Sequence, residues 1–104
     1  MGNWEWRIPS GEVVWSPTLE QIHGLPVGSF LGTFEAFQRD IHPEDRELVL
    51  NTIRNSVEAG REHFLEYRII WPDGSIHWLE ARGRLVRDHE GQPLRLIGVC
   101  SDIT

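Results

Sequence analysis

Three stretches of alternating apolar and polar residues occupy the C-terminal part of the chain, and they constrain its fold more than any other feature. The first runs over His63–Trp71, the second over Ile76–Arg87 and the third over Leu94–Ile103. A period of two residues is that of a β-strand with one buried face. Turn-forming residues lie between them at Pro72–Ser75 and Asp88–Pro93. We therefore expect an antiparallel meander of three strands.

The N-terminal part predicts a β-hairpin and three helices. Asn3–Ile8 alternates like a strand, and Glu12–Trp15 is the returning strand of the hairpin. Two short helices are expected, with Ser16 and Thr33 as their caps, and the second covers Phe34–Ile41. A longer helix begins at Pro43 and ends at Gly60, because apolar residues recur along it every three or four positions. This order predicts an α+β fold whose helices pack on one face of a single sheet.

The composition suits one globular domain and excludes several function classes. The chain has 104 residues, and we place the domain at residues 3–104 because Met1–Gly2 has the character of a start or cloning remnant. The net charge is −6, lysine is absent and the arginines are scattered, which argues against nucleic-acid binding. The longest apolar run is too short to span a membrane. A single cysteine excludes an internal disulfide.

Several short motifs, taken in their order along the chain, resemble those of the PAS domain family. They include Trp15–Ser16, Ile22–Gly24, Ile41–Arg46, Glu66–Ile69, Asp73–Gly74, His77–Leu79, Gly98–Val99 and Asp102–Thr104. The resemblance covers essentially the whole chain. It implies a five-stranded antiparallel sheet in the order 2-1-5-4-3, with short helices and one longer helix on one face, and a small cavity beneath those helices.

The resemblance also implies a role. PAS domains are sensory and dimerising modules of longer signalling proteins, and bacterial ones commonly precede a histidine kinase, a diguanylate cyclase or a phosphodiesterase. We therefore expect a cytoplasmic module that senses a small ligand or stimulus, forms a homodimer and acts on a C-terminal effector. Nothing in this segment indicates an enzyme. A ligand-free dimerisation module and a haem-based gas sensor are the alternatives.

One face of the meander is expected to line the cavity. Small residues on that face either leave room for a ligand or let backbones approach closely, so a tightly filled core is the alternative. The candidate ligand-binding residues are Phe37, Ile53, Leu65, Tyr67, Ile69, Leu79, Ala81, Gly83, Leu96, Gly98 and Cys100.

The resemblance gives little support to a resident cofactor. Haem-binding relatives use a histidine on or near the long helix, where only His42 qualifies, and capping of that helix is its alternative role. Flavin-binding relatives carry a cysteine before the long helix, which this chain lacks, and amide side chains at positions that here hold Ile69, Leu79 and Cys100. The histidines do not share a metal-ligand spacing. We leave the cofactor unassigned and expect no metal.

Two further groups are expected to act in assembly and signalling. The candidate dimer contacts are Trp4, Trp6 and Trp78, and the alternative for the first two is to seal the core. The candidate output segment, which closes the domain in the family, is Asp102, Ile103 and Thr104. We expect the Asp102 carboxylate to bind a nearby arginine or backbone amides and so to fix the direction in which the chain leaves the sheet.

Overall fold

The computed structural model describes residues 1–104, and its elements follow the order that the patterns predict. They are β1 (Gly2–Arg7), β2 (Glu12–Trp15), α1 (Pro17–Ile22), α2 (Phe34–Arg39), α3 (Pro43–Ala59), β3 (His63–Ile70), β4 (Ile76–Arg87) and β5 (Pro93–Asp102).

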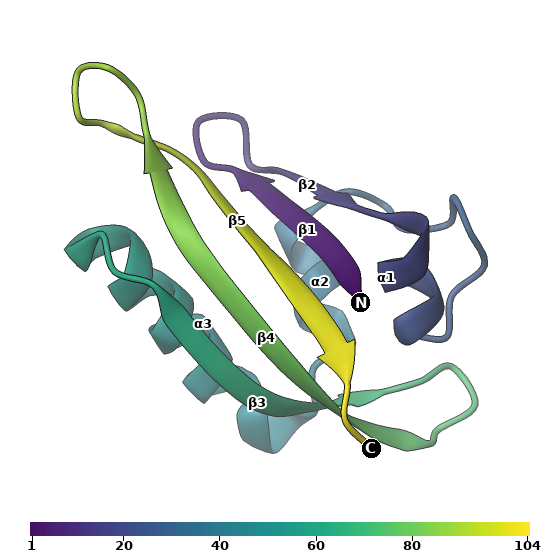
Figure 1. Ribbon diagram of the computed structural model, residues 1–104. Coiled ribbons are helices and arrows are strands. Elements are labelled where there is room, and N and C mark those ends of the chain that lie inside the picture. Colours follow the sequence, from purple (N-terminus) through teal and green to yellow (C-terminus); the bar gives the residue numbers. More distant parts are fainter.

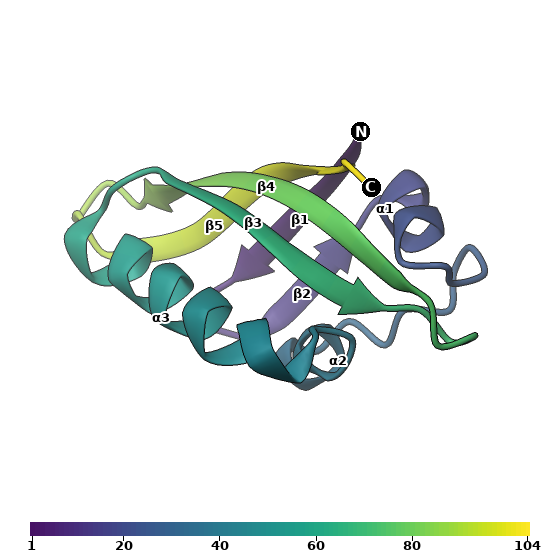
Figure 2. The ribbon, with the colours of Figure 1, turned by 90° about the horizontal axis from the view of Figure 1, so that it is seen from below.

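The strands form one antiparallel sheet in the order β2-β1-β5-β4-β3, which confirms the expected topology (Figure 1). The last strand, β5, lies between β1 and β4 and so joins the N-terminal hairpin to the meander. The sheet arches over α2 and α3, which lie on one face (Figure 2). The start of β1 lies beside the end of β5, because Gly2 pairs with Cys100.

Side-chain caps fix where the helices begin. The Ser16 hydroxyl accepts the Leu19 amide, and the Thr33 hydroxyl accepts the Ala36 amide. At the start of α3, Nδ1 of His42 accepts the amide N–H of Glu44 at 3.1 Å, so the capping role of His42 is confirmed. No helix of the chain has both the length and the apolar composition needed to cross a membrane.

Helix α2 is shorter than the expected Phe34–Ile41, because the residues after it bond to β3. Ile41 forms an isolated antiparallel bridge with Ile69. On either side of this bridge, the Ile70 amide donates to the Asp40 carbonyl and the His42 amide donates to the Arg68 carbonyl, each at 2.9 Å. These bonds require an extended backbone, which ends the helix at Arg39.

A charged pair ties the helical layer to the meander. The Arg68 side chain donates to both carboxylate oxygens of Asp45, at 2.9 Å from Nε and 2.7 Å from Nη2, and the Arg68 amide donates at 2.8 Å. The hydrogen bonds from Arg68 lower the pKa of Asp45. This bidentate pair fixes the start of α3 over β3.

Gly2, which we excluded from the domain on sequence grounds, is part of the folded structure. It is buried in β1, and a Cβ atom at this position would lie 2.6 Å from Cβ of Leu19 in α1. Only a residue without a side chain lets α1 pack this closely on the strand.

Candidate functional site

A cavity of about 50 Å³ lies between the inner face of the sheet and the helices. Sixteen residues line it, and fourteen of them are hydrophobic. The other two are His23, which follows α1, and His63, which begins β3. The site is therefore an almost entirely apolar chamber with two imidazole rings in its wall.

Most of the expected cavity residues come together in this wall. Those that line it are Phe37, Ile53, Leu65, Tyr67, Ala81, Leu96 and Cys100. Ile69 and Leu79 are completely buried on the same face of the sheet, but they lie in the packed core and do not line the cavity. Strand alternation identifies the buried face, but it does not identify which buried positions border empty space.

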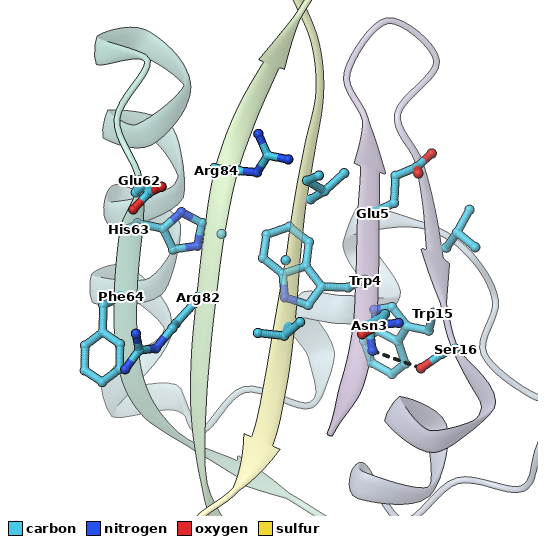
Figure 3. A pocket seen from close by; sticks show the side chains of 15 residues that line it. Asn3, Trp4, Glu5, Trp15, Ser16, Glu62, His63, Phe64, Arg82 and Arg84 are labelled. Carbon is cyan, nitrogen blue, oxygen red and sulfur yellow. Dashed lines mark hydrogen bonds between the residues drawn. The ribbon is translucent and has the colours of Figure 1, made fainter.

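Gly83 and Gly98 do not enlarge the cavity, because the Trp4 indole covers them. A Cβ atom on Gly83 would lie 2.6 Å from this ring, and one on Gly98 would collide with it as well. The ring extends from β1 toward His63, with 5.8 Å between the ring centroids (Figure 3). The room that the two glycines leave is thus filled by a side chain of the protein.

Trp4 and Trp6 both face the helices, which corrects the expectation that they form an outer dimer patch. Trp6 stacks on Phe34 of α2 with 4.9 Å between ring centroids, and both tryptophans line the cavity. They occupy alternate positions of a strand whose inner face is buried, so they share that face. Their alternative role, sealing the core, is the one that the fold uses.

His23 is a cavity residue that no pattern in the sequence marks as one. It is 2% exposed, and its Nδ1 lies 3.1 Å from the carbonyl oxygen of Leu19. Its ring lies against Trp15, with 4.2 Å between centroids. Burial lowers the pKa of His23 to about 4, so the ring is neutral at pH 7. Its Nε2 is buried and has no hydrogen-bond partner.

The other polar groups of the wall are also uncharged at neutral pH. Burial lowers the pKa of His63 and raises that of Cys100 to about 12. Burial also raises the pKa of the Tyr67 phenol, and the neighbouring Cys100 thiol raises it further. The indole Nε1 of Trp6, like His23 Nε2, is buried without a partner. The wall thus holds one unsatisfied donor and one unsatisfied nitrogen of a neutral imidazole.

A buried carboxylate shapes the loop that follows α1. Glu20 is 5% exposed and accepts the backbone amides of Gly28 and Phe30, each at 2.9 Å. These bonds lower the pKa of Glu20, the bond from Gly28 most strongly. They position Phe30 to stack on Trp15 with 3.7 Å between centroids. No pattern in the sequence marks this role, because Glu20 also suits the first turn of a helix.

The comparisons with known proteins agree with this geometry. A family model described as PAS fold matches residues 12–100. The chain belongs to the PAS family. The sensor protein FixL of Bradyrhizobium diazoefficiens is 26% identical over 103 residues, which are 99% of this chain and 20% of that protein. The chain therefore spans about a fifth of the length of this curated relative.

Two solved structures from signalling enzymes are similar to this chain. The N-terminal domain of a diguanylate cyclase with PAS/PAC sensor from Marinobacter aquaeolei superposes with a TM-score of 0.89 at 31% identity, covering 98% of this chain and 94% of that one. A sensory box histidine kinase/response regulator from Burkholderia thailandensis gives 0.84 at 28% identity, with 99% and 76% covered. This PAS domain is related to the sensor domains of histidine kinases and diguanylate cyclases.

A series of contacts links the cavity wall of the PAS domain to the end of β5. The Trp71 indole N–H donates to the Ile22 carbonyl at 3.0 Å, next to His23. The Trp71 ring stacks on His77 at 3.9 Å. His77 Nδ1 lies 3.5 Å from Oδ2 of Asp102, whose other oxygen accepts the Thr104 amide at 2.8 Å. Asp102 thus has the expected backbone-amide partner, and the side chain that faces it is the imidazole of His77 and not an arginine.

The Ser75 hydroxyl lies 2.9 Å from Nε2 of His77, and the other ring nitrogen of His77 faces Asp102. The three side chains follow each other as in the triad of a serine hydrolase, but they cannot perform its chemistry. A nucleophilic serine must give its proton to the histidine. Here the Ser75 hydroxyl donates to Asp73 at 2.6 Å. Neither the cavity nor the groove described below reaches Ser75. The cluster therefore serves to tie the turn to the strand end.

The outer face of the sheet forms a broad open groove of about 940 Å³ (Figure 3). It is lined on opposite sides by Val14 and Phe64, which are 40% and 50% exposed, with Arg82, Arg84 and charged neighbours between them. Trp78 lies on the same face and is 44% exposed, with the Arg68 guanidinium 5.4 Å from its ring centroid. Of the three candidate dimer contacts, Trp78 is the one with an exposed side chain on the outer surface, while Trp4 is partly buried and borders both the cavity and the groove.

The residues of the cavity do not fit haem or flavin. A cofactor of that size needs a pocket of roughly 300 Å³ or more, whereas this cavity measures about 50 Å³. His42 does not line the cavity, and its Nδ1 accepts the Glu44 amide. Ile69, Leu79 and Cys100 have no side-chain amide that could bond to a flavin ring. No three His, Cys, Asp or Glu side chains converge as metal ligands.

Proposed function

We propose that this PAS domain is the sensory unit of a longer signalling protein and that it binds a small molecule in the cavity. The observation that carries the proposal is the cavity wall itself, because a merely structural core does not need two buried polar nitrogens without partners. Binding would satisfy them and would change the packing of the N-terminal elements. The segment itself performs no catalysis.

The effector is a histidine kinase, a diguanylate cyclase or a phosphodiesterase that follows the PAS domain in the parent chain. Support comes from the related domains, which belong to a diguanylate cyclase and to a histidine kinase. We place the module in the cytoplasm. A single, unpaired cysteine agrees with a reducing compartment, where disulfides are rare.

The signal leaves through Asp102, Ile103 and Thr104. A ligand that moves His23 also moves the adjacent Ile22 carbonyl, and the Trp71 indole that bonds to it stacks on His77. His77 faces the Asp102 carboxylate, which orders Thr104. A change at the cavity would thus alter the direction in which the chain leaves β5.

Filling the cavity in the parent protein tests this function. Ala81→Leu places a larger side chain at a residue that is 5% exposed in the cavity wall. We expect it to shift effector output several-fold, measured as autophosphorylation or nucleotide turnover. The exposed Arg54→Leu variant is the matched control and should leave output unchanged. A well-folded Ala81→Leu protein with wild-type output would contradict the proposal.

A second variant tests the output route. Adding Asp102→Ala to the Ala81→Leu protein should return effector output toward the wild-type level, because the strand end is then no longer tied to His77 and Thr104. Output that stays displaced in the double variant would show that the signal takes another route.

The second candidate function is homodimerisation through the outer face of the sheet. Exposed apolar side chains at Trp78, Phe64 and Val14 favour it, and the same face carries both Arg82 and Glu5 for contacts across a two-fold axis. Trp78→Ser should shift the sedimentation coefficient toward that of a monomer. An unchanged dimer, or a monomeric wild-type chain at high concentration, would remove this function.

A further inference from the structure

We propose that the cavity takes a small neutral molecule that carries both a hydrogen-bond donor and an acceptor, such as a short-chain alcohol or a primary amide. The donor binds Nε2 of His23, and the acceptor receives the indole N–H of Trp6. The inference rests on the proposed ligand-sensing function and names the ligand class for the same cavity.

His23 provides the acceptor. Its Nδ1 bonds to the Leu19 carbonyl oxygen at 3.1 Å, and since a carbonyl only accepts, Nδ1 carries the proton. The pKa of about 4, lowered by burial, leaves the ring neutral, so Nε2 has a free lone pair at pH 7. That nitrogen is buried without a partner in a residue that is 2% exposed. Buried polar atoms in native proteins nearly always have a partner, so this one calls for a donor from a ligand.

Trp6 provides the donor. An indole nitrogen can only donate, and Nε1 of Trp6 is buried with no acceptor in the protein. The stacked Phe34 ring, 4.9 Å away, holds the indole in its orientation. Two residues that line one cavity therefore carry an unpaired donor and an unpaired acceptor, and a molecule with both functions is the ligand chemistry that complements them.

The wall also limits the charge of the ligand. Fourteen of its sixteen residues are hydrophobic, and neither His23 nor His63 is protonated at pH 7 because burial lowers both pKa values. An ion that entered would lose its hydration and find no opposite charge. Carboxylates, phosphates and ammonium groups are therefore excluded from the ligand class.

The volume limits the size. A cavity of about 50 Å³ is roughly a third of the 150 Å³ that hold a benzene molecule in an engineered cavity. Only a few non-hydrogen atoms fit. The rings of Trp15 and Phe37 offer apolar surface to the small hydrocarbon part of such a molecule.

Three probes of similar size test the ligand class on the ¹⁵N-labelled 104-residue chain at pH 7. Acetamide is neutral and carries a donor and an acceptor, acetate is its charged counterpart, and xenon is purely apolar. We expect acetamide alone to saturate. Of the five tryptophan indole N–H signals, that of Trp6 should move furthest downfield. The ¹⁵N signal of His23 Nε2 should move upfield, because its lone pair then accepts a hydrogen bond.

Two variants remove one hydrogen bond each. Trp6→Phe and His23→Phe should each weaken acetamide binding by about fivefold to tenfold, as expected for one neutral hydrogen bond. His89→Phe is the matched control, because the His89 side chain is 92% exposed, and it should bind like the wild type. If a cavity variant fails to fold, the shifts of the wild-type chain still decide the question.

The remaining outcomes separate the ligand class from the proposed function. Saturable binding of xenon alone would overturn the hydrogen-bonding class but would leave ligand sensing in place. Acetate that binds as tightly as acetamide would overturn the requirement for a neutral ligand. If no probe binds, the two nitrogens are served by water and the ligand class is wrong, while the Ala81→Leu output assay decides the proposed function independently.

Discussion

The meander β3–β4–β5 and the helical segment, which comprises α1, α2 and the loop between them, are stabilised in different ways. Strand β4 pairs with a neighbour along both edges, so the meander is held by backbone hydrogen bonds. The loop between the helices is instead held by single side chains such as Glu20, and α1 is tied to the meander by Trp71. A few single side-chain hydrogen bonds break more readily than the continuous row of backbone hydrogen bonds between paired strands. The meander is thus part of the fixed wall of the cavity, and the helical segment is the adaptable wall.

The largest effect should come from breaking the fixed wall. A Cβ atom in Gly98→Ala would collide with the Arg82 carbonyl oxygen and with the Trp4 ring, so we expect a loss of about 3 kcal/mol or more in the free energy of unfolding. Gly91→Ala is the control. Its backbone φ of +83° makes alanine strained, but no atom lies within 4 Å, so we expect a loss of about 1 kcal/mol. Urea unfolding measures both, and equal losses would contradict the close contact of Trp4 with the sheet.

Acid should destabilise the chain through His23, which lies in the helical segment. Its pKa is about 4 in the folded chain, against 6.5 without burial, so between these values the unfolded chain binds a proton that the folded chain does not. Stability should therefore fall as the pH drops from 6.5 to 4, by about 3 kcal/mol in total from this residue. His23→Phe should lose this component while it keeps the titration of the carboxylates. Parallel pH profiles of the two proteins would show that His23 is not buried as described.

The link between helix α3 and the meander should have a smaller effect. Asp45→Asn weakens a bidentate pair whose carboxylate also accepts the Arg68 amide, and we expect a loss of about 2 kcal/mol. Glu44→Gln is the matched control, because Glu44 makes one bond to Arg68 with a side chain that is 74% exposed. Its loss should be about 0.5 kcal/mol or less. Reversal of the two values in denaturant titrations would overturn this ranking.

The smallest global effect is expected at Glu20. In Glu20→Gln one of the two oxygens that accept the Gly28 and Phe30 amides becomes a donor, so only one of these bonds can persist. Hydrogen exchange should become faster at one or both of these amides, while the amides of β4 keep their rates. Unchanged exchange at Gly28 and Phe30 would mean that Glu20 does not hold the loop.

The meander and the helical segment also differ in how well the sequence predicts them. The bounds of β4 and the meander were predicted because a period of two and strong turn residues are local signals, whereas the order of all five strands was predicted only from the resemblance to the PAS family. The roles of Glu20 and His23, and the position of the Trp4 ring over Gly83, were not predicted, because no local pattern marks the contacts on which they depend. The wall of a cavity also depends on contacts that local patterns do not reveal. Gly83 was therefore expected beside a ligand but lies under the Trp4 ring.

We propose that an occupant of the cavity is sensed by the helical segment and that the change passes to the end of β5, while the paired centre of the meander stays fixed. Hydrogen–deuterium exchange of the 104-residue chain, with and without saturating acetamide, tests it most directly. We predict slower exchange over residues 19–30 and at Trp71 and Thr104, with unchanged rates in the paired centre of β4. Equal protection throughout the sheet, or changes confined to β4, would contradict the claim.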